Sequence, residues 1–232
     1  AEMITHFGLL PLLLAVIGLV VPSVFNFVKL PTAEEVSLEI AIVLFVVYLL
    51  SLVFTLLTHK QLFIEEDEEA QAGEHHMSKG KALAMLAVVT AVIAVMSEVL
   101  TGALEPATES LGLTPIFAGV VLLALVGNVA ESLNAVRFAR QNKMELSFGI
   151  AVGASTQVVL LVAPVLVFLS YFVGGGQHLD LIFTKFEVIA IGLTVMVVAH
   201  LTNDAECNWF EGAMLLGVYI IFAIGLFFLP ET

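Results

Sequence analysis

Seven apolar segments of about 20 residues recur along this chain of 232 residues. A helix of that length crosses the hydrocarbon core of a bilayer, where only helices and closed barrels satisfy every backbone hydrogen-bonding group. We therefore predict an all-α polytopic membrane protein with seven transmembrane helices. The predicted spans lie near 7–28, 38–58, 82–104, 115–137, 147–173, 187–203 and 211–230.

The composition excludes several other classes of protein. Hydrophobic residues make up 60% of the chain and charged residues 12%, which leaves no room for a separate soluble domain. The net charge of −13 argues against nucleic-acid binding and fits a cation as partner. The single cysteine, Cys207, excludes an intramolecular disulfide and a thiolate metal cluster. The sequence shows no arrangement for hydrolytic or redox catalysis, so we do not expect an enzyme.

The basic residues predict the orientation in the membrane. Cytoplasmic loops carry an excess of lysine and arginine. The loops after the second and fourth spans hold most of these residues, so we place both loops in the cytoplasm and the C-terminus on the opposite side. These loops contain Lys60, Lys79, Lys81, Arg137, Arg140 and Lys143, against Lys29 and Lys185 on the other side.

Glu131 gives the clearest indication of function. It lies inside the fourth predicted span. Placing a carboxylate at that depth in the bilayer costs at least ~2.5 kcal/mol, so membrane proteins keep one there mainly when it has a function. Gly127 and Asn128 precede it and offer a place for the helix to break, and secondary transporters bind their ions at broken helices. Asn128 and Glu131 share a helix face through their three-residue spacing, so an amide oxygen accompanies the carboxylate.

Other polar groups extend this predicted set of oxygen ligands. No histidine or cysteine cluster accompanies them, which disfavours zinc, copper and iron and favours calcium, magnesium, manganese, sodium or protons. We predict metal binding at Glu131 and Glu98. We predict ion and proton exchange at Glu131, Asn128, Gly127, Glu98, Ser97, Ser155 and Gln157.

Each of these residues also has a structural interpretation. Glu131 could be hydrogen-bonded within the bundle, and Glu98, which we place near the end of its span, could pack or cap. Ser155 and Gln157 could bond between helices, beside a small-residue face at Gly149 and Gly153 that permits close packing. We expect Pro106 in a loop after the third span.

A carboxylate removed from water favours its protonated form, and a metal ion must displace that proton in order to bind. One such group can therefore carry a cation in one direction and a proton in the other, but never both together. This mutual exclusion is a simple chemical basis for cation/proton exchange.

An acidic run separates the second and third spans. Its composition favours a helix, on which the like charges repel unless a divalent cation or basic groups lie nearby. We predict a cytoplasmic acidic linker or helix over 60–81 that binds regulatory calcium, and the alternative is a solvated linker. The run consists of Glu65, Glu66, Asp67, Glu68 and Glu69.

Several motifs resemble the calcium/proton antiporters of the CAX type, within the calcium/cation antiporter superfamily. They are Ser97-Glu98-Val-Leu, Leu104-Glu105-Pro106, Gly119-Val-Val-Leu-Leu-Ala-Leu-Val-Gly127-Asn128-Val-Ala-Glu131, Lys143-Met144-Glu-Leu-Ser147, Ile150-Ala-Val-Gly153-Ala-Ser-Thr-Gln157, Ala163-Pro164 and Asp204-Ala-Glu206-Cys-Asn208-Trp209-Phe-Glu211-Gly212.

The resemblance implies a fold with a lone first helix and two inverted five-helix repeats. Each repeat carries one Gly-Asn-x-x-Glu segment, whose glutamate alternates between calcium and protons. Glu131 then corresponds to the second repeat's glutamate, Gln157 to the glutamine paired with it, and the acidic helix to a regulatory calcium site. The implied domains are the end of the first repeat over 1–59, the acidic linker over 60–81 and the second repeat over 82–232.

The chain departs from this pattern because it contains Gly-Asn-x-x-Glu only once. Its spans correspond to the fifth through eleventh helices of the family. We expect the first-repeat helices to be absent from this sequence or supplied by a second polypeptide, with a homo-oligomer as a further option, and one repeat alone should not transport. Gly153-Ala154-Ser155 also replaces the usual Gly-Ser-Ser, which puts one hydroxyl ligand in doubt.

We therefore predict exchange of Ca²⁺ for H⁺ by alternating access, with calcium as the transported and regulatory ion and no other cofactor. The alternatives are a sodium/calcium or other divalent-cation exchanger of the same superfamily, a seven-span receptor, and a non-transporting membrane calcium sensor.

Overall fold

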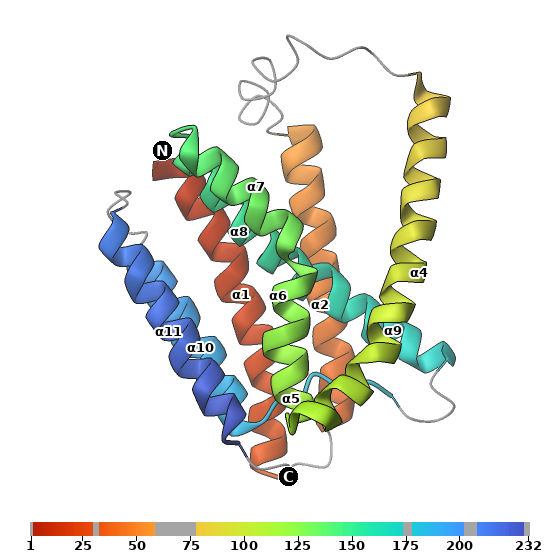
Figure 1. Ribbon diagram of the computed structural model, residues 1–232, viewed down its shortest axis with the longest axis vertical. Coiled ribbons are helices and arrows are strands. Elements are labelled where there is room, and N and C mark those ends of the chain that lie inside the picture. Colours follow the sequence, from red (N-terminus) through yellow and green to blue (C-terminus); the bar gives the residue numbers. More distant parts are fainter. Residues whose placement is uncertain (1, 30–32, 59–77, 174–177, 202–207, 230–232) are drawn as a thin grey trace. The chain divides into compact units, whose positions relative to one another are not determined.

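The computed structural model describes residues 2–29, 33–58, 78–173, 178–201 and 208–229, and these ranges are almost entirely helical (Figure 1). The α-helices are α1 (Glu2–Phe27), α2 (Ala33–Val53), α4 (Lys79–Leu111), α5 (Pro115–Phe117), α6 (Ala124–Gly127), α7 (Val129–Arg140), α8 (Met144–Gln157), α9 (Ala163–Val173), α10 (Lys185–Leu201) and α11 (Trp209–Phe227). Three π-helical segments adjoin them: η1 (Phe54–Thr58), η2 (Ala118–Leu123) and η3 (Val158–Val162).

The prediction of an all-α, multi-pass membrane protein is confirmed for the described residues. Five helical runs are long and apolar enough to cross a membrane, and a bent pair formed by Pro115–Gly127 and Val129–Arg140 makes up to six. The remaining predicted span corresponds to α10, which has 17 residues and is shorter than the others. The count of seven therefore stays a prediction. The five runs are Leu10–Phe27, Glu35–Thr58, Lys79–Leu111, Met144–Val173 and Trp209–Phe227.

The third predicted span is longer than expected, and the predicted loop at Pro106 is wrong. α4 has 33 residues and contains Pro106 in its interior. A proline removes one backbone donor, but a long helix tolerates this by bending. The residue that ends α4 is Gly112, which adopts φ 65°, while the Leu113 N–H donates to the Thr108 carbonyl oxygen at 2.9 Å. This C-cap requires a left-handed residue, a conformation that glycine adopts without strain.

The chain divides into two compact units, one over 1–58 and 128–220 and the other over 59–127 and 221–232. The first holds α1, α2, α7 to α10 and most of α11, and the second holds α4, α5, α6 and the last turns of α11. The division that the family resemblance predicts, with boundaries near 59 and 81, follows the expected repeats and stays a prediction. The acidic run 65–69 lies outside the described residues.

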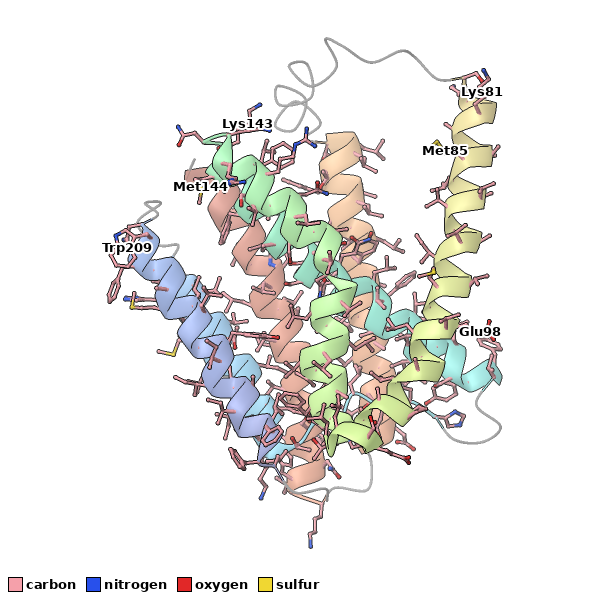
Figure 2. The ribbon with its side chains drawn as sticks, viewed as in Figure 1. Lys81, Met85, Glu98, Lys143, Met144 and Trp209 are labelled. Carbon is pink, nitrogen blue, oxygen red and sulfur yellow. The ribbon has the colours of Figure 1, made fainter. Side chains whose placement is uncertain are left out.

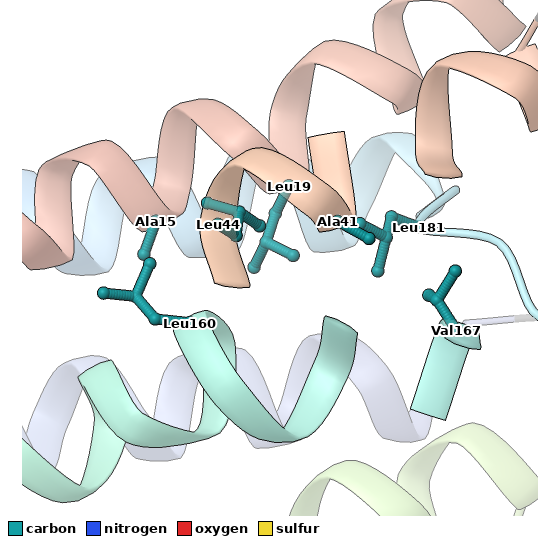
Figure 3. Packing of buried hydrophobic residues seen from close by; sticks show 7 residues of the cluster. All are labelled: Ala15, Leu19, Ala41, Leu44, Leu160, Val167 and Leu181. Atoms are coloured by element: carbon teal, nitrogen blue, oxygen red, sulfur yellow. The ribbon is translucent and has the colours of Figure 1, made fainter. Parts of the chain in front are cut away.

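The core of the first unit forms where α1 and α2 pack against each other and α2 packs against η3 and α9 (Figure 3). Leu44 of α2 is almost fully buried, and Gly18 of α1 allows this contact, because a β-carbon at Gly18 would lie 2.8 Å from Leu44 Cδ2. The buried cluster consists of Ala15, Leu19, Ala41, Leu44, Leu160, Val167 and Leu181.

Two buried serines hold an extended segment, 178–184, that precedes α10. Ser23 Oγ of α1 accepts from the Phe183 N–H at 2.8 Å and lies 3.4 Å from the Leu181 carbonyl oxygen, to which it can donate. Ser37 Oγ of α2 accepts from the Leu181 N–H at 3.2 Å. Backbone groups outside a helix need protein partners when water is excluded, and these hydroxyls supply them.

Replacing Ser23 with alanine should destabilise the protein by about 1–3 kcal/mol, because the buried Phe183 N–H loses its acceptor. The measurement is the unfolding midpoint in detergent micelles. Ser51→Ala is the control, since Ser51 Oγ bonds only to the carbonyl of Tyr48 in its own helix. Equal midpoints for the two variants would show that the serine contacts of the extended segment contribute little.

Gly18→Val should lower the unfolding midpoint by more than Gly192→Val. Both positions lie inside helices, so the intrinsic cost of valine is similar. A β-carbon at Gly18 meets Leu44 at 2.8 Å, whereas none of the described atoms lies within 4 Å of a β-carbon at Gly192. A milder effect at Gly18 than at Gly192 would contradict the packing of α1 on α2.

Candidate functional site

Asn128 interrupts the fourth predicted span. Its backbone has φ −99° and ψ 16°, outside the helical region, and it separates α6 from α7. The two parts of the span are bent by 52° at this break. The Ser132 N–H donates to the Asn128 carbonyl oxygen at 2.9 Å, so Asn128 is the N-cap from which α7 begins. The break predicted at Gly127 and Asn128 is confirmed.

Glu131 lies in the first turn of α7, three residues after the N-cap. The first N–H groups of a helix have no acceptor within the helix, and the helix dipole favours a negative charge there. Glu131 is partly buried, and its Oε2 atom is buried without a hydrogen-bond partner among the described residues. An unpartnered buried carboxylate oxygen is costly unless a cation or a proton neutralises it.

Two other helices begin with a similar pattern. In both, the glutamate side chain caps the first turn, unlike Oε2 of Glu131. The Thr184 N–H donates to Glu187 Oε2 at 2.8 Å and the Glu187 N–H to Thr184 Oγ1 at 3.3 Å, which is a reciprocal capping box before α10. Asn208 and Glu211 pair in the same way before α11. At α7, by contrast, the Asn128 side chain makes no capping bond and Glu131 Oε2 stays unpaired.

α8 packs antiparallel to α7, through the tight turn at Gln141–Lys143. Figure 2 shows Lys143 and Met144 at this turn. The Lys143 N–H donates to the Phe138 carbonyl oxygen at 2.9 Å, and Asn142 adopts φ 62°.

The turn sets the register between the two helices. Glu131 lies nine residues before Arg140, the last residue of α7, and Gly153 lies nine residues after Met144, the first residue of α8. Counted from the turn, Glu131 therefore pairs with Gly153 along the two helices, and Asn128 pairs with Thr156.

The count from the turn pairs the Gly153 motif with Glu131, and the polar residues of this motif differ in their surroundings. Ser155 is exposed, and its hydroxyl donates to the Ala151 carbonyl oxygen of its own helix at 3.0 Å. Gln157 is exposed at the end of α8. Thr156, which the sequence analysis did not select, has a buried Oγ1 atom that finds no partner in the described chain. Its spacing from Gly149 and Gly153 along one helix face was the available signal.

Among the described residues no other element packs closely on Gly149 and Gly153, so the close packing expected there stays a prediction. A β-carbon at either glycine would meet no atom within 4 Å. The same holds for Gly127, which ends α6. Gly149 and Gly153 therefore leave open space along one face of α8.

α8 changes its hydrogen bonding directly after Gln157. The Ala163 N–H reaches back five residues to the Val158 carbonyl oxygen, and these residues form η3. Pro164 follows and has no N–H, so it cannot donate to the carbonyl of Leu160. Such π-helical turns occur frequently at functional sites, where they displace the helix locally.

Ser97 and Glu98 lie on α4, in the second unit. Figure 2 labels Glu98 on this helix. Glu98 is exposed within that unit and lies in the middle third of α4, not near the end of the span as predicted, because the helix continues to Leu111. The Ser97 carbonyl oxygen accepts from Thr101 Oγ1 at 2.9 Å. A site shared by these residues, Gly127 and Glu131 stays a prediction.

Carboxylates do not cluster in the described part of the chain, where no group of three or more Asp, Glu, His or Cys residues could hold a metal ion. Glu187 and Glu211 are occupied by their helix caps. A cation beside Glu131 would therefore depend on neutral oxygens within the first unit or on groups from elsewhere. The predicted regulatory residues 65–69 lie outside the described ranges.

Comparison with known proteins gives concordant matches. The family described as Sodium/calcium exchanger protein matches residues 81–228. The Ca(2+)/H(+) antiporter of Aphanothece halophytica is 40% identical over 94% of this chain and 62% of its own length. The Ca(2+)/H(+) antiporter ChaA of Bacillus subtilis (strain 168) is 37% identical over 92% of this chain and 61% of its own length.

A solved structure, described as native YfkE, is similar with a TM-score of 0.77 and 32% sequence identity, covering 97% of this chain and 63% of that one. The chain thus spans less than two thirds of the length of these relatives. The resemblance predicted from the motifs is confirmed, and this chain belongs to the sodium/calcium exchanger protein family, as a relative of its calcium/proton antiporters.

Proposed function

We propose that this chain is the second-repeat part of an antiporter that exchanges Ca²⁺ for H⁺ across a membrane by alternating access. The observation that carries the proposal is the unpartnered, buried Oε2 atom of Glu131 at the start of a helix that resumes inside a membrane span. The relatives named Ca(2+)/H(+) antiporter support the same activity.

Glu131 couples the two ions because its charge must be neutralised. A helix N-terminus favours a nearby carboxylate by about 0.3–1 kcal/mol, or about 2 kcal/mol in partly buried geometries. Leaving a buried ionised carboxylate without a partner costs more than this. The ionised, empty site is therefore the unfavourable state, and either a proton or a cation relieves it. Since both occupy the same oxygen, each must leave before the other binds.

The remaining ligands belong to the same proposal. The α7–α8 hairpin would supply Glu131, Asn128 and Gln157, and the register that sets Asn128 level with Thr156 supports this grouping. Gly127, Ser97 and Glu98 are the other members of the proposed set. Ser155 is the weakest member, because its hydroxyl already bonds to its own helix.

The complete transporter would contain more than this sequence. We propose seven spans, with α10 among them, that correspond to the fifth through eleventh helices of the family fold. The chain contains Gly-Asn-x-x-Glu once and spans 62% of the Aphanothece relative. The first-repeat site would come from further helices or a second polypeptide. The cytoplasmic position of 60–81, the opposite position of the C-terminus and regulatory calcium binding at 65–69 are parts of this proposal.

A second candidate is exchange of sodium for calcium. The description of the matched family, Sodium/calcium exchanger protein, is the observation that favours it. Its chemistry at Glu131 would be similar, because sodium and calcium both prefer oxygen ligands.

Glu131→Gln should abolish calcium uptake, because the neutral amide no longer needs a proton or cation to neutralise it. The measurement is calcium uptake driven by an imposed proton gradient, in membrane vesicles that contain this chain together with the first-repeat helices. Glu145→Gln is the matched control, since Glu145 is exposed in the first turn of α8. Uptake at the wild-type rate by Glu131→Gln, at equal protein level, would refute the role of Glu131.

The two candidate functions differ in the gradient that drives uptake. Calcium uptake in the same vesicles should follow an imposed proton gradient and should be unaffected by an equal sodium gradient when the pH difference is collapsed. Uptake that requires sodium and persists without a pH difference would favour the sodium/calcium exchanger.

A further inference from the structure

Thr156 carries the second unpartnered oxygen of the structure. Among the described residues, two side-chain oxygen atoms are buried without any hydrogen-bond partner: Glu131 Oε2 and Thr156 Oγ1. Both belong to the first unit, on the two helices α7 and α8 that pack against each other.

Counted from the turn, these two positions lie about one helical turn apart along the paired helices α7 and α8. Thr156 is level with Asn128, the N-cap of α7, and lies three residues beyond Gly153, which is level with Glu131. Three residues correspond to a rise of about 4.5 Å, close to one helical turn. Gly153 and Thr156 also share a face of α8 by their spacing. By the same count Gly153 is level with Glu131, and a β-carbon at Gly153 would meet no neighbouring atom within 4 Å.

The Thr156 hydroxyl is buried and makes no hydrogen bond to its own helix. A serine or threonine inside a helix commonly donates to the carbonyl oxygen four residues earlier. Ser155 does so at 3.0 Å and Thr194 at 2.7 Å, and Thr55, Thr58 and Thr101 make the same kind of bond. Thr156 does not, although its oxygen is buried. Its hydroxyl thus lacks the bond to the preceding helical turn that these five hydroxyls make.

We propose that Thr156 Oγ1 is a ligand of the same cation that Glu131 binds, as a neutral hydroxyl oxygen beside the carboxylate. This inference rests on the proposed exchange at Glu131. Hard cations such as calcium take carboxylate oxygens together with neutral oxygens, and a single carboxylate is insufficient for them. Thr156 therefore supplies the hydroxyl that Ser155, occupied by its own helix, does not.

Thr156→Val tests the inference because valine has a similar shape and lacks the hydroxyl. It should raise the calcium concentration that half-saturates proton-driven uptake by about tenfold, which corresponds to the loss of one charge-assisted contact. It should leave the melting temperature without calcium unchanged or higher, because a buried polar atom without a partner is removed. The same shift in calcium dependence should appear in calcium-induced thermal stabilisation of the assembled protein.

Two further variants define the comparison. Thr156→Ser keeps the hydroxyl and should stay within about threefold of the wild type in calcium dependence. Thr194→Val removes a hydroxyl that bonds only to its own helix and should leave calcium dependence unchanged. Thr156→Ala replaces Thr156→Val if the valine variant does not accumulate in the membrane.

The outcomes separate this inference from the proposed function. A lower melting temperature without calcium, with calcium dependence unchanged, would show a structural hydroxyl and overturn the inference. Unchanged half-saturation in Thr156→Val, with wild-type exchange intact, would overturn it and leave the role of Glu131 standing. Absence of proton-driven uptake by the wild-type assembly would remove the proposed function, and the inference with it.

Discussion

Backbone hydrogen bonding without water underlies the rest of this structure. Each peptide group in a membrane interior needs a partner within the protein, so the chain is helical almost wherever it is described. The exceptions are informative because each one needs a special arrangement. The extended segment before α10 depends on the hydroxyls of Ser23 and Ser37. The turn at Gly112 closes α4 with bonds that only a left-handed residue permits.

The break at Asn128 is another place where backbone groups lose their partners within a helix. A helix that begins inside a span presents N–H groups without acceptors and the positive end of its dipole. α10 and α11 satisfy their first turns with a glutamate that bonds back to the N-cap residue. α7 has a glutamate at the same position, yet one of its oxygens remains buried and unpaired. In the proposed antiporter, this unpaired oxygen is the one that binds the ion.

The arrangement also explains why charge balance and conformational change belong together in the proposed antiporter. Glu131 and Thr156 lie on a hairpin whose two helices are joined by the short turn Gln141–Lys143. Directly beyond this hairpin, on the α8 side, the hydrogen bonding changes in η3 before Pro164. A local departure from α-helical bonding is a place where a helix adjusts without breaking. The hairpin that carries the two oxygens is therefore followed directly by a π-helical segment.

The sequence by itself determined the helical membrane class, the apolar spans, the break before Glu131 and the family, because hydrophobic length and intramembrane acids are local signals. The predicted loop at Pro106 was wrong, because whether a helix continues past a proline depends on where the next stop signal lies. Here that signal is Gly112, which ends α4. Tertiary structure alone decided which hydroxyl is available. Ser155 and Thr156 are adjacent and chemically alike, but one bonds to its own helix and the other is buried without a partner. Spacing places Thr156 on one helix face with Gly149 and Gly153, but the burial of its oxygen and the bond that Ser155 makes are visible only in the folded chain.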